Sequence, residues 1–209
     1  MDSAVTDTAP EVRGGFPEVK PVDAPPELGR FIAAMRRLQD LTVSTDPESA
    51  MWTTAAEQVE SACALLEGHQ VPEGRAPAGR DIELPGLGHP LLPPWTVTDF
   101  GPDGVTMEGL FTRSHVGGNN AVHGGMIPLL YDWHFGMIVS TAGLPPSRTA
   151  YLHVDYRNIT PIDEPLTAYG RIAEIDGRKA FVTATMTAAD GTLLSEANGL
   201  MVRLLPHQP

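Results

Sequence analysis

Apolar residues follow two different periods along this 209-residue chain, and the change between them divides it into two parts. Between residues 27 and 68 apolar positions recur every three or four residues, which is typical of amphipathic helices. The first predicted helix has one face formed by Leu28, Phe31, Ile32, Met35, Leu38 and Leu41. The second has a face formed by Trp52, Ala55, Ala56, Val59, Ala62, Cys63 and Leu66.

The second helix is predicted to begin at Asp46-Pro47, with Asp46 as the N-cap and Pro47 at the first helical position. We expect the two helices to form a hairpin that packs on the next domain or on a partner subunit. Residues 1–26 are rich in Pro, Asp, Gly and Thr, and predict a flexible leader. Residues 69–94 are rich in Pro and Gly, and predict an irregular linker.

From residue 95 onward the pattern predicts strands around a single helix, which is an α+β arrangement. Two strands at 95–100 and 104–111 precede a polar loop, RSHVGGNNAV, and an apolar helix near 124–143. Four more strands are predicted as an antiparallel meander at 148–157, 165–175, 178–189 and 192–204. Asp-Gly pairs at 176–177 and 190–191 indicate tight hairpin turns. Alternation places Leu152, Val154 and Tyr156 on one face of their strand.

Charge and composition exclude several classes of partner. The net charge is −12 and Lys and Arg form no cluster, so we expect no nucleic-acid partner. Cys63 is the one cysteine, which excludes an internal disulfide and favours a cytoplasmic location. The first residues lack the basic and apolar regions of a secretory signal. The apolar stretch 125–144 contains Asp132 and His134, so we expect a buried helix and no membrane span.

Motifs for metals and common cofactors are missing from the sequence. His115, His123, His134 and His153 do not have the spacing of metal ligands, so we expect no metal site. There is no phosphate-binding loop and no dinucleotide fingerprint, and we expect no cofactor. No serine lies in the G-x-S-x-G context of an α/β-hydrolase.

The segment HGGMIPLLYD, residues 123–132, carries the most specific chemistry. Pro128 is tolerated in the first turn of a helix, so the helix is expected to begin close to Gly124 and Gly125. Their backbone N–H groups then lie at the positive end of the helix dipole, where they favour an oxyanion or a polarised carbonyl oxygen. Asp132 follows about two turns later among apolar neighbours, where burial of a carboxylate is costly. Spacing alone leaves Asp132 either catalytic or structural.

This segment resembles the HGG-to-Asp signature of hotdog-fold acyl-CoA thioesterases of the PaaI-like superfamily. TAYLHVDYRNITPIDEPL and GTLLSEANGLMVRL resemble the next strand and the closing strand of that family. The resemblance covers about residues 95–205, and implies a hotdog thioesterase domain over 95–209. Such a domain has about six antiparallel strands wrapped around a long central helix, here with an N-terminal helical extension. It also implies a homodimer, or a dimer of dimers, whose subunits pair edge to edge.

Carried over residue by residue, the resemblance implies a role for each motif position. Asp132 serves as general base or nucleophile, and Gly124 and Gly125 supply the oxyanion contact. Thr149 is expected to reach in from the neighbouring subunit and orient the water. His123 is expected to shape the turn and to hydrogen-bond the backbone, with a role as catalytic acid as the alternative. His134 points away from Asp132 and is expected in the core or at an interface.

Substrate contacts are less well matched to the family. Many members carry Asn six residues before the motif His, and this chain has Gly117 there. Asn119 and Asn120 are the candidates to replace it. The candidate contacts for the CoA phosphates are Arg113, Arg148 and Arg157.

We therefore expect a thioester hydrolase that converts acyl-CoA to the free acid and CoA, in keeping with a role in fatty acid metabolism. Two alternatives remain. One is a non-catalytic module that binds acyl-CoA or regulates a partner. The other is a hotdog hydratase or dehydratase of enoyl thioesters that uses His123 and Asp132.

Overall fold

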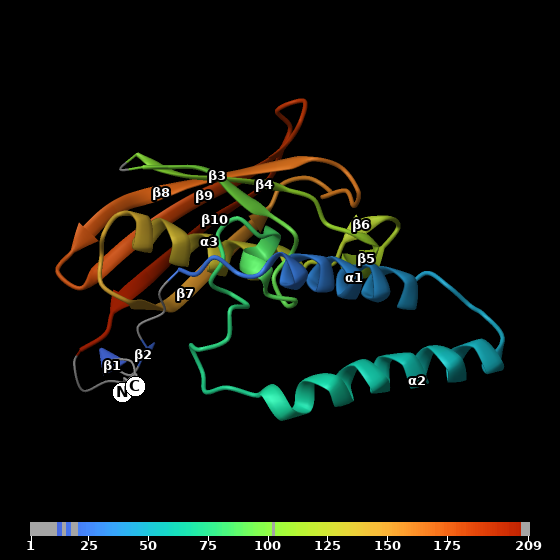
Figure 1. The fold of residues 1–209 in the computed structure, drawn as a ribbon. Coiled ribbons are helices and arrows are strands. Elements are labelled where there is room, and N and C mark those ends of the chain that lie inside the picture. The colour runs from blue at the N-terminus through green and yellow to red at the C-terminus, as the bar shows by residue number, and fades with distance from the viewer. Residues whose placement is uncertain (1–11, 14–15, 18–20, 102, 206–209) are drawn as a thin grey trace, which may run out of the picture.

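The computed structural model describes residues 12–13, 16–17, 21–101 and 103–205 (Figure 1). The α-helices within them are α1 (Pro26–Thr42), α2 (Ser49–Leu66) and α3 (Met126–Thr141). The main sheet contains β3 (Thr96–Gly101), β4 (Gly104–Gly109), β7 (Ser147–Tyr156), β8 (Leu166–Asp176), β9 (Lys179–Ala188) and β10 (Leu193–Arg203). Short pairs are formed by β1 (Val12–Arg13) with β2 (Phe16–Pro17), and by β5 (Val116–Gly118) with β6 (Ala121–Val122). The 3-10 turns are η1 (Glu67–His69), η2 (Pro85–Gly88) and η3 (Arg113–His115).

The sheet is antiparallel throughout, with strand order β3-β4-β8-β9-β10-β7. The prediction of a four-strand meander is wrong for β7, which pairs with β10 and not with β8. The Asp-Gly turns join β8 to β9 and β9 to β10, whereas β7 and β8 are joined by residues 157–165, which include two prolines. This connection has no tight turn, and β8 begins further into the sheet, separated from β7 by β10 and β9.

The sheet curves around α3, which lies against its inner face (Figure 1). Two glycines let the helix approach closely. A Cβ atom on Gly199 of β10 would lie 2.6 Å from Phe135 Cε2, and one on Gly170 of β8 would lie 2.6 Å from Ile138 Cδ1. Buried apolar side chains of α3 fill the space between helix and sheet. A six-stranded antiparallel sheet around one long helix confirms the predicted α+β hotdog architecture.

The two N-terminal helices differ in how they pack. α1 contacts η2 and η3, and its Ile32 is buried. α2 has no buried residue, and in Figure 1 it runs apart from α1 and from the sheet. Trp52 and Val59, on its predicted apolar face, are each 40% exposed. The expected packing on the next domain is therefore wrong for α2, and packing on a partner subunit stays a prediction.

The start of α2 also differs from the prediction. Glu48 is the N-cap and provides no side-chain cap, and the helix begins at Ser49. Glu48 has an extended backbone with ψ 152°, so the helical conformation does not start at Pro47.

The segments predicted as leader and linker are tied together where they are described. Val22 N–H donates to the Arg80 carbonyl at 3.1 Å, and Ala24 N–H donates to the buried Asp81 carboxylate at 2.9 Å. Most of the predicted flexible leader, residues 1–26, lies outside the described residues. Between residues 69 and 94 the backbone is irregular apart from η2 and the last residue of η1.

Candidate active site

The glycine turn at the start of α3 is held by side chains on both sides. Gly125 N–H donates to His123 Nδ1 at 3.0 Å, and the Tyr156 hydroxyl donates to the Gly124 carbonyl at 2.8 Å. Both groups belong to the same peptide unit, so the orientation of this peptide plane is fixed at its two ends. His123 Nδ1 is the acceptor in this hydrogen bond, so the ring lies against the turn. His123 thus shapes the turn, as predicted.

The N–H groups of the turn are not equally available. Gly125 N–H is occupied by His123, whereas Gly124 N–H has no hydrogen-bond partner among the described residues. Pro128 lies in the first turn of α3, where its missing N–H leaves no hydrogen bond unmade. Within the described chain Gly124 N–H is therefore an unpaired donor at the positive end of α3, as an oxyanion contact requires.

Asp132 lies on the same face of α3 as Gly125. Seven residues rotate the helix by about 700°, which is close to two full turns, so the two residues lie in one line along the axis. The Asp132 side chain is exposed, and its Oδ1 accepts a hydrogen bond of 2.7 Å from Thr149 Oγ1 on β7. Thr149 Oγ1 also lies 3.4 Å from the Met201 sulfur on β10.

Two expectations about Asp132 change with this geometry. Its apolar sequence neighbours suggest a costly buried carboxylate, but the neighbours point into the core and Asp132 points out. Thr149 was expected to come from another subunit, and here it reaches Asp132 from the same chain. The reason is that β7 runs along α3, so that Tyr156 meets the helix start and Thr149 meets its second turn.

Tyr131, just before Asp132, and His134, two residues after it, belong to the core. His134 is completely buried and bonds the Val105 carbonyl through Nε2 at 3.0 Å. Burial lowers the pKa of His134 to about 4, so the ring is neutral at physiological pH. Tyr131 donates to Ser195 in the sheet, and burial raises the pKa of its hydroxyl. The prediction of a core position for His134 is confirmed.

The loop before the glycine turn folds as the small hairpin β5–β6. Asn119 and Asn120 form its tip with φ of 50° and 55°, a conformation that asparagine tolerates. Both are exposed, and the Asn120 side chain accepts from Arg113 Nη1 at 3.1 Å. A Cβ atom on Gly117 would lie 2.7 Å from His123 Cα, so no side chain fits there in this conformation. The family's Asn is thus sterically excluded, and its replacement by Asn119 or Asn120 stays a prediction.

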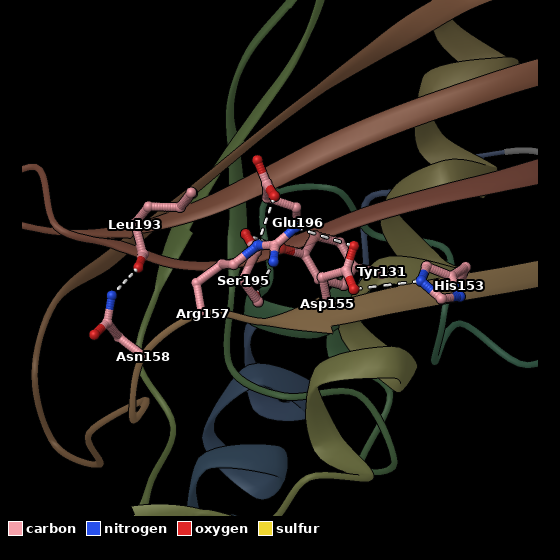
Figure 2. A network of polar contacts seen from close by, with 8 residues as sticks. All are labelled: Tyr131, His153, Asp155, Arg157, Asn158, Leu193, Ser195 and Glu196. Atoms are coloured by element: carbon pink, nitrogen blue, oxygen red, sulfur yellow. Dashed lines mark hydrogen bonds and ion pairs between the residues drawn. The ribbon is translucent and has the colours of Figure 1, made fainter.

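The arginines predicted for CoA phosphates occupy different surroundings. Arg148 is exposed and precedes Thr149 on β7. Arg157 donates to Glu196 at 2.8 Å and to Asp155 at 3.2 Å, and His153 lies 3.4 Å from Asp155. Figure 2 shows this exposed network, with Tyr131 and Ser195 beside it. Two carboxylates already compensate the charge of Arg157, so a phosphate would have to compete with them.

Tyr156 is a site residue that the sequence reasoning did not single out. Its strand alternation places it on the same face as Leu152 and Val154, which is the face that meets α3. That pattern indicates an inward side chain, but only the register of β7 against α3 brings the hydroxyl to Gly124. Across the described residues no three His, Cys, Asp or Glu side chains are grouped to hold a metal ion. In the same residues no helix is both long and apolar enough to cross a membrane.

Comparison with known proteins identifies the family of this segment. Residues 119–195 match the family model described as Thioesterase superfamily. The matched range contains the glycine turn, Asp132 and Thr149. The acyl-coenzyme A thioesterase THEM4 of Rattus norvegicus is 34% identical over 89 residues, which are 42% of this chain and 38% of that protein. The Mus musculus THEM4 is 33% identical over the same shares. The match therefore spans about two fifths of the length of these curated relatives.

Solved structures share the fold to different extents. A crystal structure of a thioesterase superfamily protein covers 88% of this chain and 93% of its own, with TM-score 0.74 and 28% identity. The predicted hotdog domain, residues 95–209, makes up 115 of 209 residues, or 55% of the chain. A likeness that covers 88% of the chain therefore also includes parts of the N-terminal helices. A Streptococcus mutans structure bound to acetyl CoA covers 55% of this chain and 91% of its own, with TM-score 0.50 and 17% identity, and shows the fold alone. The family match over the glycine turn and Asp132, together with the shared fold, supports the resemblance seen in the sequence: residues 119–195 match the Thioesterase superfamily and lie within a hotdog fold.

Proposed function

We propose that this protein hydrolyses acyl-CoA thioesters to the free acid and CoA. The observation that carries the proposal is the position of Asp132, exposed on α3, hydrogen-bonded to Thr149 and in line with the glycine turn. The curated relatives, which are described as acyl-coenzyme A thioesterases, support the same substrate class.

The proposed chemistry divides between the helix start and the carboxylate. The thioester carbonyl oxygen accepts from Gly124 N–H, and the helix dipole stabilises the negative charge that develops there. Asp132 takes a proton from water as the water oxygen adds to the carbonyl carbon. The tetrahedral intermediate then collapses, the C–S bond breaks, and the CoA thiolate takes up the proton that Asp132 received, which restores the carboxylate.

A second route uses the same carboxylate as a nucleophile. Asp132 then attacks the carbonyl carbon and expels the thiolate, and water opens the resulting anhydride. In either route Thr149 holds Oδ1, so Oδ2 is left to face the water or the thioester. His123 keeps the turn in place, and Gly125 N–H joins the oxyanion contact only if the His123 ring turns away from it.

The test is a panel of acyl-CoAs assayed for thiol release with the wild type and Asp132→Asn. General base catalysis contributes roughly 10²–10⁴-fold, so the variant is expected to lose activity by about that factor. Asp99→Asn is the matched control, because Asp99 is an exposed carboxylate on β3, outside the site. Unchanged hydrolysis in Asp132→Asn would contradict the mechanism.

Binding and hydration measurements on the same panel, extended to enoyl-CoA, separate the alternatives. If the wild type binds acyl-CoA and hydrolyses none, the protein is a binding module. If it hydrates enoyl-CoA instead, it is a hydratase.

The proposal includes a homodimer. β7 is an edge strand of ten residues that pairs with β10 alone among the described strands. Its Thr149 is exposed, and so is Asp132 next to it. A long exposed edge of this kind favours pairing with a second strand. Pairing of two β7 edges would cover the site and limit its contact with bulk solvent.

A further inference from the structure

A pocket of about 460 Å³ opens between α1, the linker and the start of α3. Ligand pockets span roughly 300–1,000 Å³, so this volume suits a small molecule or part of a larger one. Its apolar lining consists of Leu38, Val43, Pro90, Leu91 and Met126. Leu38, Val43 and Leu91 are 40%, 55% and 62% exposed, so apolar surface is left in contact with water.

The pocket walls are held in place by polar contacts from α1. Arg36 Nη2 donates to the carbonyls of Pro85, His89 and Leu92 at 3.0–3.2 Å. Asp40 Oδ1 accepts from Ser114 N–H at 2.8 Å. These contacts fix α1 to the linker on one side and to η3 on the other, so the pocket is largely preformed.

The lining carries no formal charge. Its polar members are Gln39, Thr42, Ser114 and His115, and Asp, Glu, Lys and Arg are missing from its described lining. His115 Nδ1 accepts from Thr112 N–H at 2.8 Å, and burial lowers the pKa of this imidazole, so His115 is neutral. An uncharged apolar ligand therefore suits the pocket better than a phosphate or a nucleotide.

The pocket lies directly beside the glycine turn. Met126, one of its lining residues, is the first residue of α3 and follows Gly125. The backbone of His115, another lining residue, accepts from His123 N–H at 2.8 Å. A carbonyl group bound at the turn therefore has an apolar pocket next to it, built by a helix outside the hotdog core.

We propose that this pocket binds the acyl chain of the substrate, and that α1 thereby selects extended apolar acyl groups over short ones. The inference rests on the proposed function and adds a specificity site to it. Filling the pocket is expected to weaken binding of long acyl groups and to spare short ones, because only a long chain reaches it.

The experiment compares two non-hydrolysable thioethers, S-dodecyl-CoA and S-ethyl-CoA, by calorimetry with the full chain. Leu38→Trp fills the pocket, and Leu41→Trp is its control, since Leu41 is an α1 leucine of similar exposure (44%) that does not line the pocket. We expect Leu38→Trp to bind S-dodecyl-CoA about tenfold or more weakly, with S-ethyl-CoA unchanged and Leu41→Trp like the wild type. Equal thermal unfolding of the two variants checks the fold.

Three results would overturn the inference. They are unchanged S-dodecyl-CoA binding in Leu38→Trp, equal loss of both thioethers, and no S-dodecyl-CoA binding by the wild type. Equal loss would assign the pocket to the CoA part of the ligand. Hydrolysis is measured in parallel and judged separately. If the wild type is inactive but shows the predicted binding pattern, the proposed hydrolysis is refuted and the acyl pocket is supported. If the wild type is active and Leu38→Trp binds both thioethers as the wild type does, the acyl pocket is refuted and the hydrolysis is supported.

Discussion

Two exposed tyrosines of the sheet each donate a hydroxyl hydrogen bond of 2.8 Å to a backbone carbonyl, but only one of these carbonyls lies in the candidate site. Tyr156 binds the Gly124 carbonyl at the glycine turn, and Tyr169 binds the Asp103 carbonyl in the β3–β4 turn. Their exposures are 54% and 43%, so removal of either hydroxyl leaves similar packing behind. A comparison of Tyr156 with Tyr169 therefore isolates the effect of the hydrogen bond at the glycine turn.

Tyr156→Phe is expected to lower kcat for acyl-CoA hydrolysis several-fold, with little change in thermal stability. One hydrogen bond contributes about 1 kcal/mol, which corresponds to roughly a fivefold change in rate if it acts only through the oxyanion contact. Steady-state kinetics measure the effect, and Tyr169→Phe should keep the wild-type kcat. An equal decrease of kcat in both variants, or a change in KM with kcat unchanged, would argue against a positioning role for Tyr156.

At the residue scale, the motif positions could be predicted because their relation is local. Pro128 limits where the helix starts, and helix periodicity then puts Gly125 and Asp132 in line. The exposure of Asp132 could not be predicted in this way. Its neighbours are apolar in sequence, but burial depends on which face of α3 the sheet covers.

At the scale of elements, α3 can approach the sheet closely because glycine, which has no side chain, occupies the contact position. Gly199 faces Phe135 from β10, and its backbone is not in the left-handed region. The requirement for glycine there is steric, because any Cβ atom would overlap the aromatic ring. The sequence shows the glycine but not its partner, since the contact joins residues 64 positions apart.

Gly199→Ala is expected to destabilise the protein by about 1–3 kcal/mol, as overpacking in a filled core does. Urea unfolding measures the change. Gly101→Ala is the control, because a Cβ at Gly101 meets nothing within 4 Å, and it should be neutral or slightly stabilising. Equal stability of the two variants would mean that α3 moves away from the sheet at little cost.

At the scale of the whole molecule, one edge of the sheet and the site lie together. Among the described strands β7 ends the strand order, and its Thr149 contacts Asp132. α2 adds a second surface with apolar residues, including Trp52 and Val59, that nothing in the described chain covers. Both features are typical of a subunit that buries exposed surface by forming an oligomer.

Light scattering with gel filtration is expected to give a mass of about 45 kDa, twice the 22.4 kDa of one chain. The mass should persist on dilution into the micromolar range. A stable monomer at that concentration would count heavily against the dimer and against a site covered by β7 pairing. A mass of four chains would agree with the dimer of dimers.

The sequence by itself determined the elements and the local chemistry of this protein. Amphipathic periods, Asp-Gly turns and the Pro128 position act over a few residues, so the helices, the main strands and the glycine turn follow from them. Only the tertiary structure decided that β7 lies beside β10, that Thr149 meets Asp132 within one chain, and that Tyr156 and His123 hold one peptide plane. These are contacts between distant segments, and their outcome depends on how the sheet closes around α3, which no local pattern encodes.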